Sequence, residues 1–361
     1  MSQHNWNQIF TSLIRQDNKN LWGNWGLSDS VRIGAVGKIS GDGQFTHYLD
    51  LGSLKAEDID KKPPTFKWQV RSKGTKKTDN QVSLGGGCID PSTGVKVDAG
   101  IETSWTFSED LSVVSEMAIA RVEQIKNIDE FVKQYYQKMF TALEQVEGVK
   151  AENKGILQGY GFISKVIYAS SGVNIASYAK NTSFSITGTA DATHALLGDG
   201  GKLKTKASYI SEKASESVNA LTWPSDPNTV VDELVPIAYE FCSFADSNKP
   251  ILAWTGLINS LQLNINSVSG CTYIVRCHLT YQLPNKSQRH SEKFSVSGGL
   301  SHNIGLPLNA EKVKLDLSFV GVMSNQDMSF EWAYPLRQWR NGRCQVNLQG
   351  VWPGKAKANE V

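Results

Sequence analysis

The sequence lacks the features of several protein classes. It has no run of about 18 apolar residues, which a membrane-spanning helix would need. Its first residues lack the basic and apolar segments of a Sec signal peptide, so we expect synthesis in the cytosol and action at a target membrane. Its 37 Lys and Arg are balanced by 35 Asp and Glu, which argues against a nucleic-acid partner, because binding to phosphates needs an excess of positive charge.

The sequence also has few of the residues that form metal, redox or catalytic sites. Its cysteines are odd in number and none has C-x-x-C spacing, so we expect reduced, mostly buried thiols. The six histidines include no H-E-x-x-H pattern, and the carboxylates show no pairing suited to acid–base chemistry. We therefore predict no metal, no cofactor and no enzymatic activity. The cysteines are Cys88, Cys242, Cys271, Cys277 and Cys344.

Charge and composition change together near residue 246. Residues 1–245 hold 25 Lys and Arg against 28 Asp and Glu, whereas residues 246–361 hold 12 against 7. Helical patterns stop there, and short strand-like runs punctuated by Gly and Pro follow. With 246–250 as a polar linker, we predict an α+β domain over 1–245, with a twisted antiparallel sheet, helices and extended β-hairpin regions. An all-β sandwich domain follows over 251–361.

Two amphipathic helices are predicted in the first domain. Over residues 5–16, apolar side chains recur at helical spacing after Asn5, a suitable N-cap. A second helix should begin at Asn127, where Asn-Ile-Asp-Glu forms a capping box, and should end before Gly148. We interpret both apolar faces as core packing, with membrane contact an alternative for the first helix.

A basic and aromatic segment covers residues 61–77. It contains seven cations and no acid, with Phe66 and Trp68 among them. Each Lys or Arg near an anionic leaflet gains about 1 kcal/mol, and Trp favours the headgroup region. The composition fits lipid contact, but an exposed strand kept soluble by Lys would look the same.

Strict alternation of apolar and polar residues marks two regions. From Val95 to Phe107 every odd position carries an apolar side chain or Thr, and the even positions are small or polar. Positions 182–190 and 203–209 behave alike on either side of the Gly-rich stretch 198–201. Such strands pack one face on a core in many soluble proteins, but 13 residues also exceed the 9–11 that a tilted strand needs to span a bilayer.

In the order of these features, residues 1–245 resemble the pore-forming domain of the gasdermins. A helix and a basic-aromatic segment precede an extended region (81–114), a helix and the strand 161–168. A second extended region (173–220) follows, and the domain closes with Thr222-Trp-Pro224 and Val235-Pro-Ile-Ala-Tyr-Glu-Phe241.

The resemblance implies a protein that binds anionic lipid, assembles with copies of itself and refolds its extended regions into membrane-spanning hairpins. By position, the implied lipid-binding residues are Arg15, Lys19, Lys61, Lys62, Phe66, Lys67, Trp68, Arg71 and Lys73. The implied membrane-inserting residues are Val95, Val97, Ile101, Trp105, Phe107, Phe184, Ile186, Leu203 and Tyr209.

Residues 251–361 resemble the C-terminal membrane-recognition domain of the cholesterol-dependent cytolysins. The segments 273–281, 304–308 with 313–317, and 350–353 lie in matching order, and 330–340 takes the place of that family's Trp-rich loop. This loop lacks the family's cysteine, and the Thr-Leu pair that reads sterol is absent from the adjoining loop. A sterol, a glycan or a protein receptor therefore all remain open as the target. The implied recognition residues are Trp332, Tyr334, Trp339 and Trp352, and we expect at least two of them to fill the sandwich core instead.

Together these patterns predict a pore-forming, toxin-like protein that binds a membrane, oligomerises and inserts β-hairpins. The alternative is a non-lytic binding protein, such as a lectin or adhesin, which would adhere to its target without causing leakage.

Overall fold

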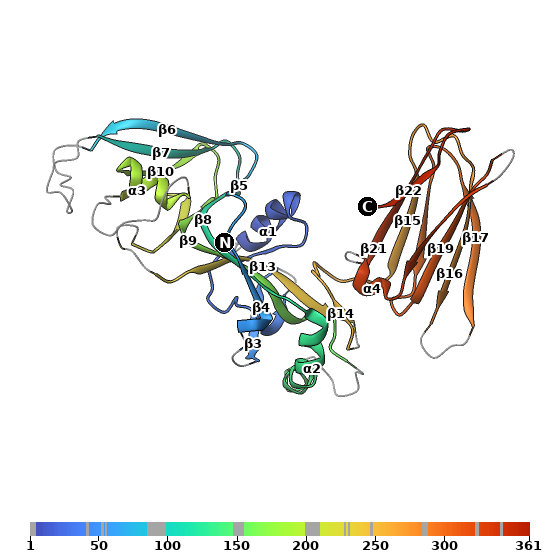
Figure 1. Cartoon of the computed structure of the whole chain (residues 1–361). Helices are drawn as coiled ribbons and strands as arrows, with labels where there is room; N and C mark the ends of the chain where they lie inside the picture. The colour runs from blue at the N-terminus through green and yellow to red at the C-terminus, as the bar shows by residue number, and fades with distance from the viewer. Residues whose placement is uncertain are drawn as a thin grey trace. The chain divides into compact units, whose positions relative to one another are not determined.

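The computed structural model describes residues 5–40, 43–51, 54, 56–84, 99–146, 155–198, 210–226, 229, 232–245, 248–283, 288–321, 325–339 and 342–361. The chain divides into two compact units (Figure 1). The first consists of Met1–Leu143 and Gly161–Phe241, and the second of Glu144–Tyr160 and Cys242–Val361. Each unit is described by itself below. The linker at 246–250 stays a prediction.

The main sheet of the first unit is built around two long strands, β8 and β9. Its order is β1-β13-β9-β2-β3, with β8 and β12 also paired to β9, and with β4 and β5 paired to β8. Both faces of β9 are almost entirely buried, which fits its nearly continuous apolar sequence. The strands are β1 (Trp22–Gly23), β2 (Ala35–Ile39), β3 (Phe45–Asp50), β4 (Ile59–Lys62), β5 (Trp68–Arg71), β8 (Ser112–Ile125), β9 (Tyr160–Ser177), β12 (Val218–Trp223) and β13 (Val235–Phe244).

A second, smaller sheet in this unit has the order β11-β10-β7-β6, all antiparallel. Its strands are β6 (Thr75–Ser83), β7 (Ala99–Phe107), β10 (Thr182–Gly188) and β11 (Ile210–Ala214). The predicted strand at 95–107 is thus confirmed from Ala99 onward, while 95–98 lie outside the described residues. The predicted continuation of β10 to Ala190 is wrong, because a helix, α3 (Ala190–Leu196), begins there with Thr189 as its N-cap.

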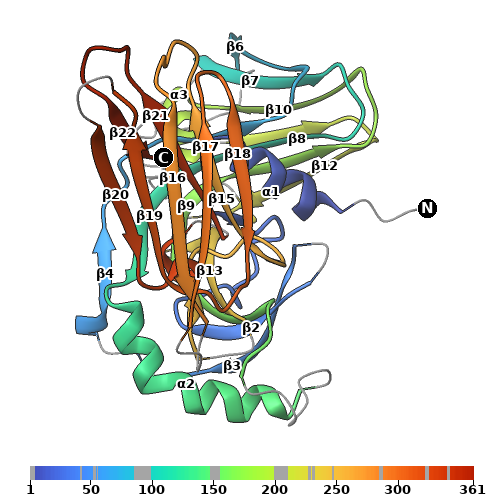
Figure 2. The ribbon, with the colours of Figure 1, turned by 90° about the vertical axis from the view of Figure 1, so that its right-hand side faces the viewer.

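The two predicted helices of the first unit are confirmed. Helix α1 (Trp6–Asp17) begins after Asn5, whose side chain accepts a hydrogen bond from the backbone N–H of Gln8. Helix α2 (Ile128–Glu144) begins after Asn127, whose side chain accepts from the N–H of Glu130. In Figure 2, α2 lies beside β3. A 3₁₀ turn, η1 (Ala56–Asp58), precedes β4.

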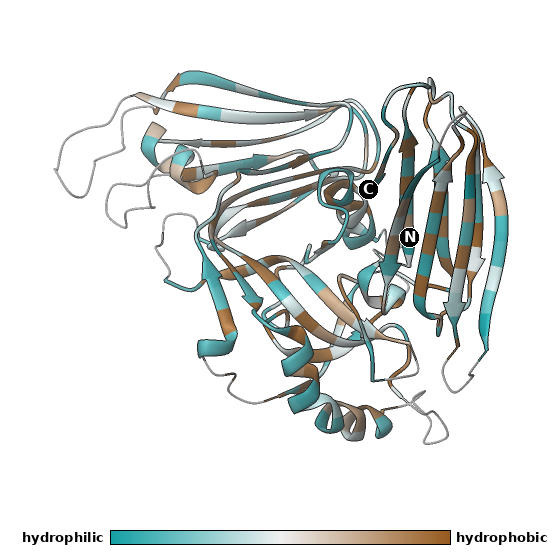
Figure 3. Ribbon diagram, turned by 45° about the vertical axis from the view of Figure 1, so that its right-hand side comes forward, coloured by the Kyte–Doolittle hydropathy of each residue, from teal (hydrophilic) through white to brown (hydrophobic). Residues whose placement is uncertain are grey.

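The second unit contains a β-sandwich, drawn in Figure 1 as two layers of orange to red strands. One sheet has the order β18-β15-β21-β22, with β15 and β21 parallel, and the other has the order β17-β16-β19-β20. Figure 3 shows polar and apolar residues alternating along these strands, as a two-layer core requires. The strands of the sandwich are β15 (Leu261–Ser267), β16 (Val275–Gln282), β17 (Arg289–Val296), β18 (Ser301–Leu306), β19 (Glu311–Phe319), β20 (Gln326–Trp332), β21 (Arg343–Gln349) and β22 (Lys357–Glu360). The short strand β14 (Pro250–Ile251) is not part of it and pairs with Ser243 and Phe244 of β13.

The fold class predicted from the sequence is confirmed: an α+β part with antiparallel sheets is followed by a β-sandwich. The sequence predicts strands of the sandwich at 260–268, 271–283, 292–296, 313–320 and 344–351, and β15, β16, β17, β19 and β21 confirm them. Strands β18, β20 and β22 and the short helix α4 (Pro335–Gln338) were not predicted. The prediction of buried thiols is confirmed for Cys242, Cys271, Cys277 and Cys344, which are all free. Cys88 lies outside the described residues.

Candidate functional site

One face of the small sheet is buried against the main sheet. Trp105 and Phe107 of β7 and Phe184 and Ile186 of β10 are at most 1% exposed. They share an apolar cluster with residues of β8, β9 and α3, among them Ile175. Trp105 and Phe184 are cross-strand partners, and their ring centroids lie 5.9 Å apart. The structure thus gathers four of the predicted membrane-inserting side chains into one packed face.

The opposite face of the same two strands is polar. On β7 it carries Glu102, Ser104 and Thr106, and on β10 it carries Ser183 and Thr187, all partly or fully exposed. The apolar face weakens toward the start of β7, where Ile101 is only partly buried. Val95, Val97, Leu203 and Tyr209, also predicted to insert, lie outside the described residues.

A buried carboxylate ties the small sheet to the main one. Glu116 of β8 is 0% exposed, and its Oε1 accepts a hydrogen bond of 2.9 Å from Nε1 of Trp105. The same oxygen accepts from Nε of Arg71 at 2.8 Å, and Oε2 accepts from Nζ of Lys77 at 2.8 Å. We call Glu116, Arg71, Lys77 and Trp105 the Glu116 cluster; it joins β5, β6, β7 and β8.

One glycine allows β9 to lie close to β8 beside the Glu116 cluster. Gly172 of β9 has a φ of +147°, and a Cβ there would lie 2.4 Å from the carbonyl oxygen of Glu116. Any larger residue would push β9 away from β8 beside the cluster.

Strand β6 does not continue the apolar face. Its residues opposite Trp105, Thr103 and Ile101 are Lys77, Asp79 and Gln81. Lys77 is ion-paired with Glu116, and Asp79 accepts a hydrogen bond of 2.7 Å from Thr103. The apolar face of the small sheet is therefore made by β7 and β10, with Ile210 at the start of β11.

The residues predicted to bind lipid through the basic-aromatic segment are divided between surface and interior. Trp68 is 3% exposed and donates from Nε1 to Oγ of Ser115 at 2.9 Å, and Arg71 belongs to the Glu116 cluster. In contrast, Phe66, Lys67 and Lys73 are exposed.

Lys61 and Lys62 lie on β4 and are also exposed, but both are ion-paired. Lys61 pairs with Glu123 at 3.2 Å, and Lys62 pairs with Asp60 at 2.9 Å.

Helix α1 places its two predicted lipid contacts differently. Arg15 donates from Nε to the carbonyl of Leu21 at 2.9 Å, and its guanidinium lies 4.0 Å from the ring centroid of Trp22. Burial lowers the pKa of Arg15 to about 10, so this cation is part of the packing of the helix. Lys19 lies beyond the helix end and is exposed.

In the sandwich, two of the four predicted recognition residues are buried. Trp332 and Trp339 pack edge to face with centroids 5.2 Å apart, and Nε1 of Trp332 donates to Glu360 at 3.0 Å. Tyr334 is exposed and lies under the ammonium group of Lys249 at 4.8 Å. Trp352 is also exposed, but it lies at the other end of the sandwich.

The strand directions place Trp352 at the opposite end of the sandwich from the segment 330–340. The turns after β15, β17, β19 and β21 share one end, whereas α4 and its neighbours lie at the other. At the first end, four large apolar side chains are between 47% and 63% exposed: Ile274, Leu300, Val351 and Trp352. We call them the apolar tip.

Hydrogen bonds tie the turns of the apolar tip together. The N–H of Thr272 donates to Gly350 at 3.0 Å, and that of Trp352 donates to Oγ1 of Thr272 at 2.8 Å. The N–H of Val320 donates to Ile274. Sequence reasoning found only Trp352. Of the other three, Leu300 could have been suspected, because it is a single apolar residue between Gly299 and Ser301 in a turn.

The described residues contain no group of three or more His, Cys, Asp or Glu side chains that could hold a metal ion. No helix in the described ranges is long and apolar enough to cross a membrane.

No family model matches the sequence, and no curated protein matches it. Among solved structures, the chain is similar to the cytotoxin suilysin from Streptococcus suis, with 10% identity, 80% of this chain and 68% of that chain covered, and a TM-score of 0.22. For listeriolysin O these values are 12%, 81%, 67% and 0.22. For a disulfide-locked mutant of intermedilysin with human CD59 they are 8%, 82%, 68% and 0.23.

These neighbours are cholesterol-dependent cytolysins, which are pore-forming toxins. TM-scores this low do not establish a common fold, so the function has to be inferred from this chain's own residues. The gasdermin-like character of residues 1–245 stays a prediction.

Proposed function

We propose that this chain is a pore-forming protein that binds a target membrane, assembles with copies of itself and inserts β7 and β10 into the bilayer. The observation that carries the proposal is the buried face made by Trp105, Phe107, Phe184 and Ile186 on a sheet separate from the main one. Because the other face of these strands is polar, they already have the alternation of a barrel strand. The proposal assigns no catalytic step.

Insertion would exchange one apolar environment for another. Each of these large side chains gains about 2 kcal/mol from leaving water, and it keeps that gain in hydrocarbon. Strand β7 has nine residues, which is the length that a tilted strand needs to span the bilayer. The energetic barrier therefore lies in undocking the sheet, where the Glu116 cluster must be broken.

The pair β7–β10 is a better inserting unit than the pair β6–β7. Strand β6 would turn Lys77, Asp79 and Gln81 to the lipid, and a Lys near the bilayer midplane costs about 2–4 kcal/mol. Strands β7 and β10 are already antiparallel neighbours, with Phe184 opposite Trp105, so they can move together.

Assembly is part of this proposal and not a later step. In hydrocarbon, an isolated strand pair leaves one row of backbone groups unpaired along each edge, at a cost of several kcal/mol per group. A ring of identical chains pairs every edge with the next subunit, as a closed barrel does.

We assign the first membrane contact to the apolar tip. Leu300, Val351 and Trp352 are held outward by a hydrogen-bonded set of turns, and Trp favours the headgroup region. Lys67 and Lys73 of the first unit, both exposed, would add about 1 kcal/mol each near an anionic leaflet. We also propose that the extended regions of residues 1–245 refold into membrane-spanning hairpins, as the resemblance to the gasdermins implies.

The test is dye release from sealed vesicles, with and without anionic lipid and with and without cholesterol, together with electron microscopy of the membranes. The proposal expects release of a small dye and rings or arcs of protein. Binding without release would favour the non-lytic lectin or adhesin, and absence of both would contradict the proposal.

A further inference from the structure

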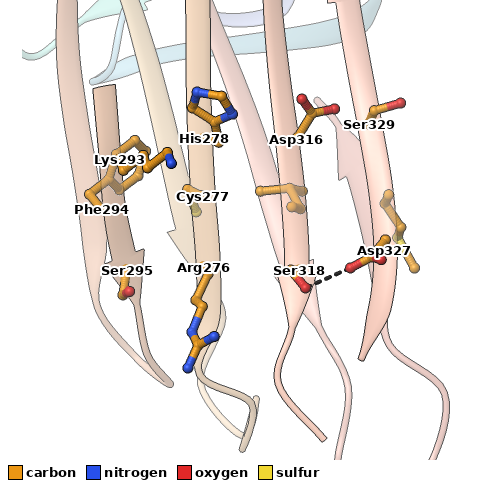
Figure 4. Close-up of a pocket in the computed structure, with 12 residues that line it drawn as sticks. Arg276, Cys277, His278, Lys293, Phe294, Ser295, Asp316, Ser318, Asp327 and Ser329 are labelled. Atoms are coloured by element: carbon orange, nitrogen blue, oxygen red, sulfur yellow. Dashed lines mark hydrogen bonds between the residues drawn. The ribbon is translucent and has the colours of Figure 1, made fainter. Parts of the chain in front are cut away.

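A polar trough crosses the exposed face of the sheet β17-β16-β19-β20 (Figure 4). It is an open depression with a volume of about 780 Å³, within the range of small-molecule sites. Because neighbouring strands lie about 4.8 Å apart, a trough across four strands is about 14 Å long. Its floor runs along the backbone of Cys277 and Leu317, whose side chains are buried in the sandwich core.

One wall of the trough is a row of four residues in register across the strands. Ser295, Arg276, Ser318 and Asp327 lie side by side in that order. Ser318 donates a hydrogen bond of 2.6 Å to Asp327, and this carboxylate has no cationic partner among the described residues. Arg276 is exposed and makes no ion pair within the described part of the chain.

The other wall is the row two residues farther from the apolar tip on each strand. Lys293, His278, Asp316 and Ser329 lie in that order. Asp316 is paired with Lys314 at 3.1 Å, and His278 is hydrogen-bonded to Ser291 at 2.8 Å. Lys293 is exposed and, like Arg276, has no ion-pair partner in the described ranges.

The two walls give the trough opposite chemistry at its ends. Two cations, Arg276 and Lys293, stand diagonally across β16 and β17, close enough for their side chains to meet at one group. In Figure 4, Lys293 reaches toward β16, whereas Arg276 extends along its strand away from Lys293, so binding of one group by both cations requires Arg276 to change rotamer. At the far end, Asp327 and the hydroxyls of Ser318 and Ser329 offer hydrogen-bond acceptors and donors without a cation.

We propose that the trough binds a short oligosaccharide that carries a carboxylate. Arg276 and Lys293 would bind the carboxylate through charge-assisted hydrogen bonds, and Asp327 with the serines would bind sugar hydroxyls. The two aromatic rings of the trough, Phe294 and His278, are only partly exposed, and Phe294 is stacked on His302, so the carboxylate determines affinity. The mixed charges disfavour nucleic acid.

The position of the trough suits a glycan on a cell surface. Arg276 is the second residue of β16, and this strand begins at the end of the sandwich that bears the apolar tip. A ligand projecting from a membrane could therefore be reached while the tip contacts the lipid. The binding inference itself does not depend on pore formation.

The experiment is calorimetric titration of the full chain with 3′-sialyllactose, with lactose as the neutral match and with lactose 3′-sulfate, which carries a sulfate and no carboxylate. We expect saturable binding of sialyllactose at millimolar concentrations or below, and binding of lactose about tenfold weaker or absent. The double variant Arg276→Ala/Lys293→Ala should lose at least about tenfold in affinity, because it removes both charge-assisted hydrogen bonds to the carboxylate. Asp327→Asn should lose about fivefold.

Lys357→Ala is the control, because Lys357 is exposed on β22 of the other sheet. Equal binding by the double variant and the unaltered chain would overturn the assignment, as would equal binding of lactose or no binding of any of the three sugars. A preference for the sulfated sugar would contradict the carboxylate. Vesicle leakage plays no part in these readouts, so failure here and failure of the pore proposal are separate results.

Discussion

Trp105 and Glu116 lie on strands of two different sheets and are joined by a hydrogen bond of 2.9 Å from the indole Nε1 to the carboxylate Oε1. The indole belongs to the face that we propose to enter the membrane, and the carboxylate belongs to the sheet that stays behind. Arg71 and Lys77 hold the same carboxylate. Opening the small sheet therefore breaks ion pairs and apolar packing in one event, which makes undocking cooperative.

Removing the charge of Glu116 should weaken this contact. In Glu116→Gln the cations Arg71 and Lys77 lose their buried counter-charge, and we expect a loss of about 3 kcal/mol in the free energy of unfolding, measured by urea titration. Hydrogen exchange of β6 and β7 should accelerate more than that of β9.

The control is Asp60→Asn, which breaks the exposed pair with Lys62 and should cost less than about 1 kcal/mol. Equal effects of the two variants would show that the Glu116 cluster contributes nothing special to docking.

The alternation of β7 predicts opposite results for two lysine substitutions. Ile101 is partly buried on the apolar face, and Thr106 is exposed on the polar face, so both Ile101→Lys and Thr106→Lys should fold. Ile101→Lys should reduce dye release at least about tenfold, because a lipid-facing Lys costs about 2 kcal/mol in each subunit. Thr106→Lys should leave release within about twofold. Equal release by both variants would remove β7 from the membrane.

The apolar tip should control binding and not the later steps. Leu300 is 61% exposed at the tip, and Leu257 is 75% exposed at the other end of the sandwich. Leu300→Asp should weaken vesicle binding about tenfold in a sedimentation assay, since it loses the burial of one Leu side chain. Leu257→Asp should bind like the unaltered chain. Weaker binding by Leu257→Asp alone would place the membrane contact at the opposite end.

The buried thiols should be inert until the fold opens. Burial raises the pKa of Cys277 to about 12 and also raises the pKa of Cys242 and Cys344. At pH 8 the Cys277 thiolate should be about a thousandfold scarcer than in a free cysteine, so mass spectrometry should find it alkylated only after denaturation.

The same shifts set the direction of the pH dependence. The folded state favours the neutral thiols, so their contribution to stability is complete below about pH 8.5 and is lost as the pH rises through about 12. Stability that rises with pH over this range would contradict the burial of these groups.

Local sequence patterns predicted the strands of the small sheet because alternation is a local signal. The period of two placed Trp105 and Phe107 on one face of β7, and Phe184 and Ile186 on one face of β10. The pattern did not predict what covers that face. The partners of Glu116 lie 11, 39 and 45 residues away along the chain, and no local signal connects them.

Composition did not predict whether an aromatic residue lies on the surface or in the core. Trp68 lies in a highly basic segment, which suggested a lipid wedge, yet its side of β5 faces helix α1 and its indole packs on Phe10 with centroids 6.2 Å apart. For the sandwich, the expectation that at least two of the four recognition residues fill the core is confirmed by Trp332 and Trp339. In both cases the deciding factor is a second layer contributed by a distant segment.

The most direct test of the central proposal follows the environment of β7 on the membrane. Single cysteines placed at the five least buried positions, Ala99, Ile101, Glu102, Ser104 and Thr106, would carry a polarity-sensitive fluorophore in a background without the native cysteines. On vesicles, the account predicts an apolar shift at 99 and 101 and none at 102, 104 and 106, with lipid-soluble quenchers acting only on the first two. Unchanged spectra at all five positions, or a shift without this alternation, would contradict the insertion of β7.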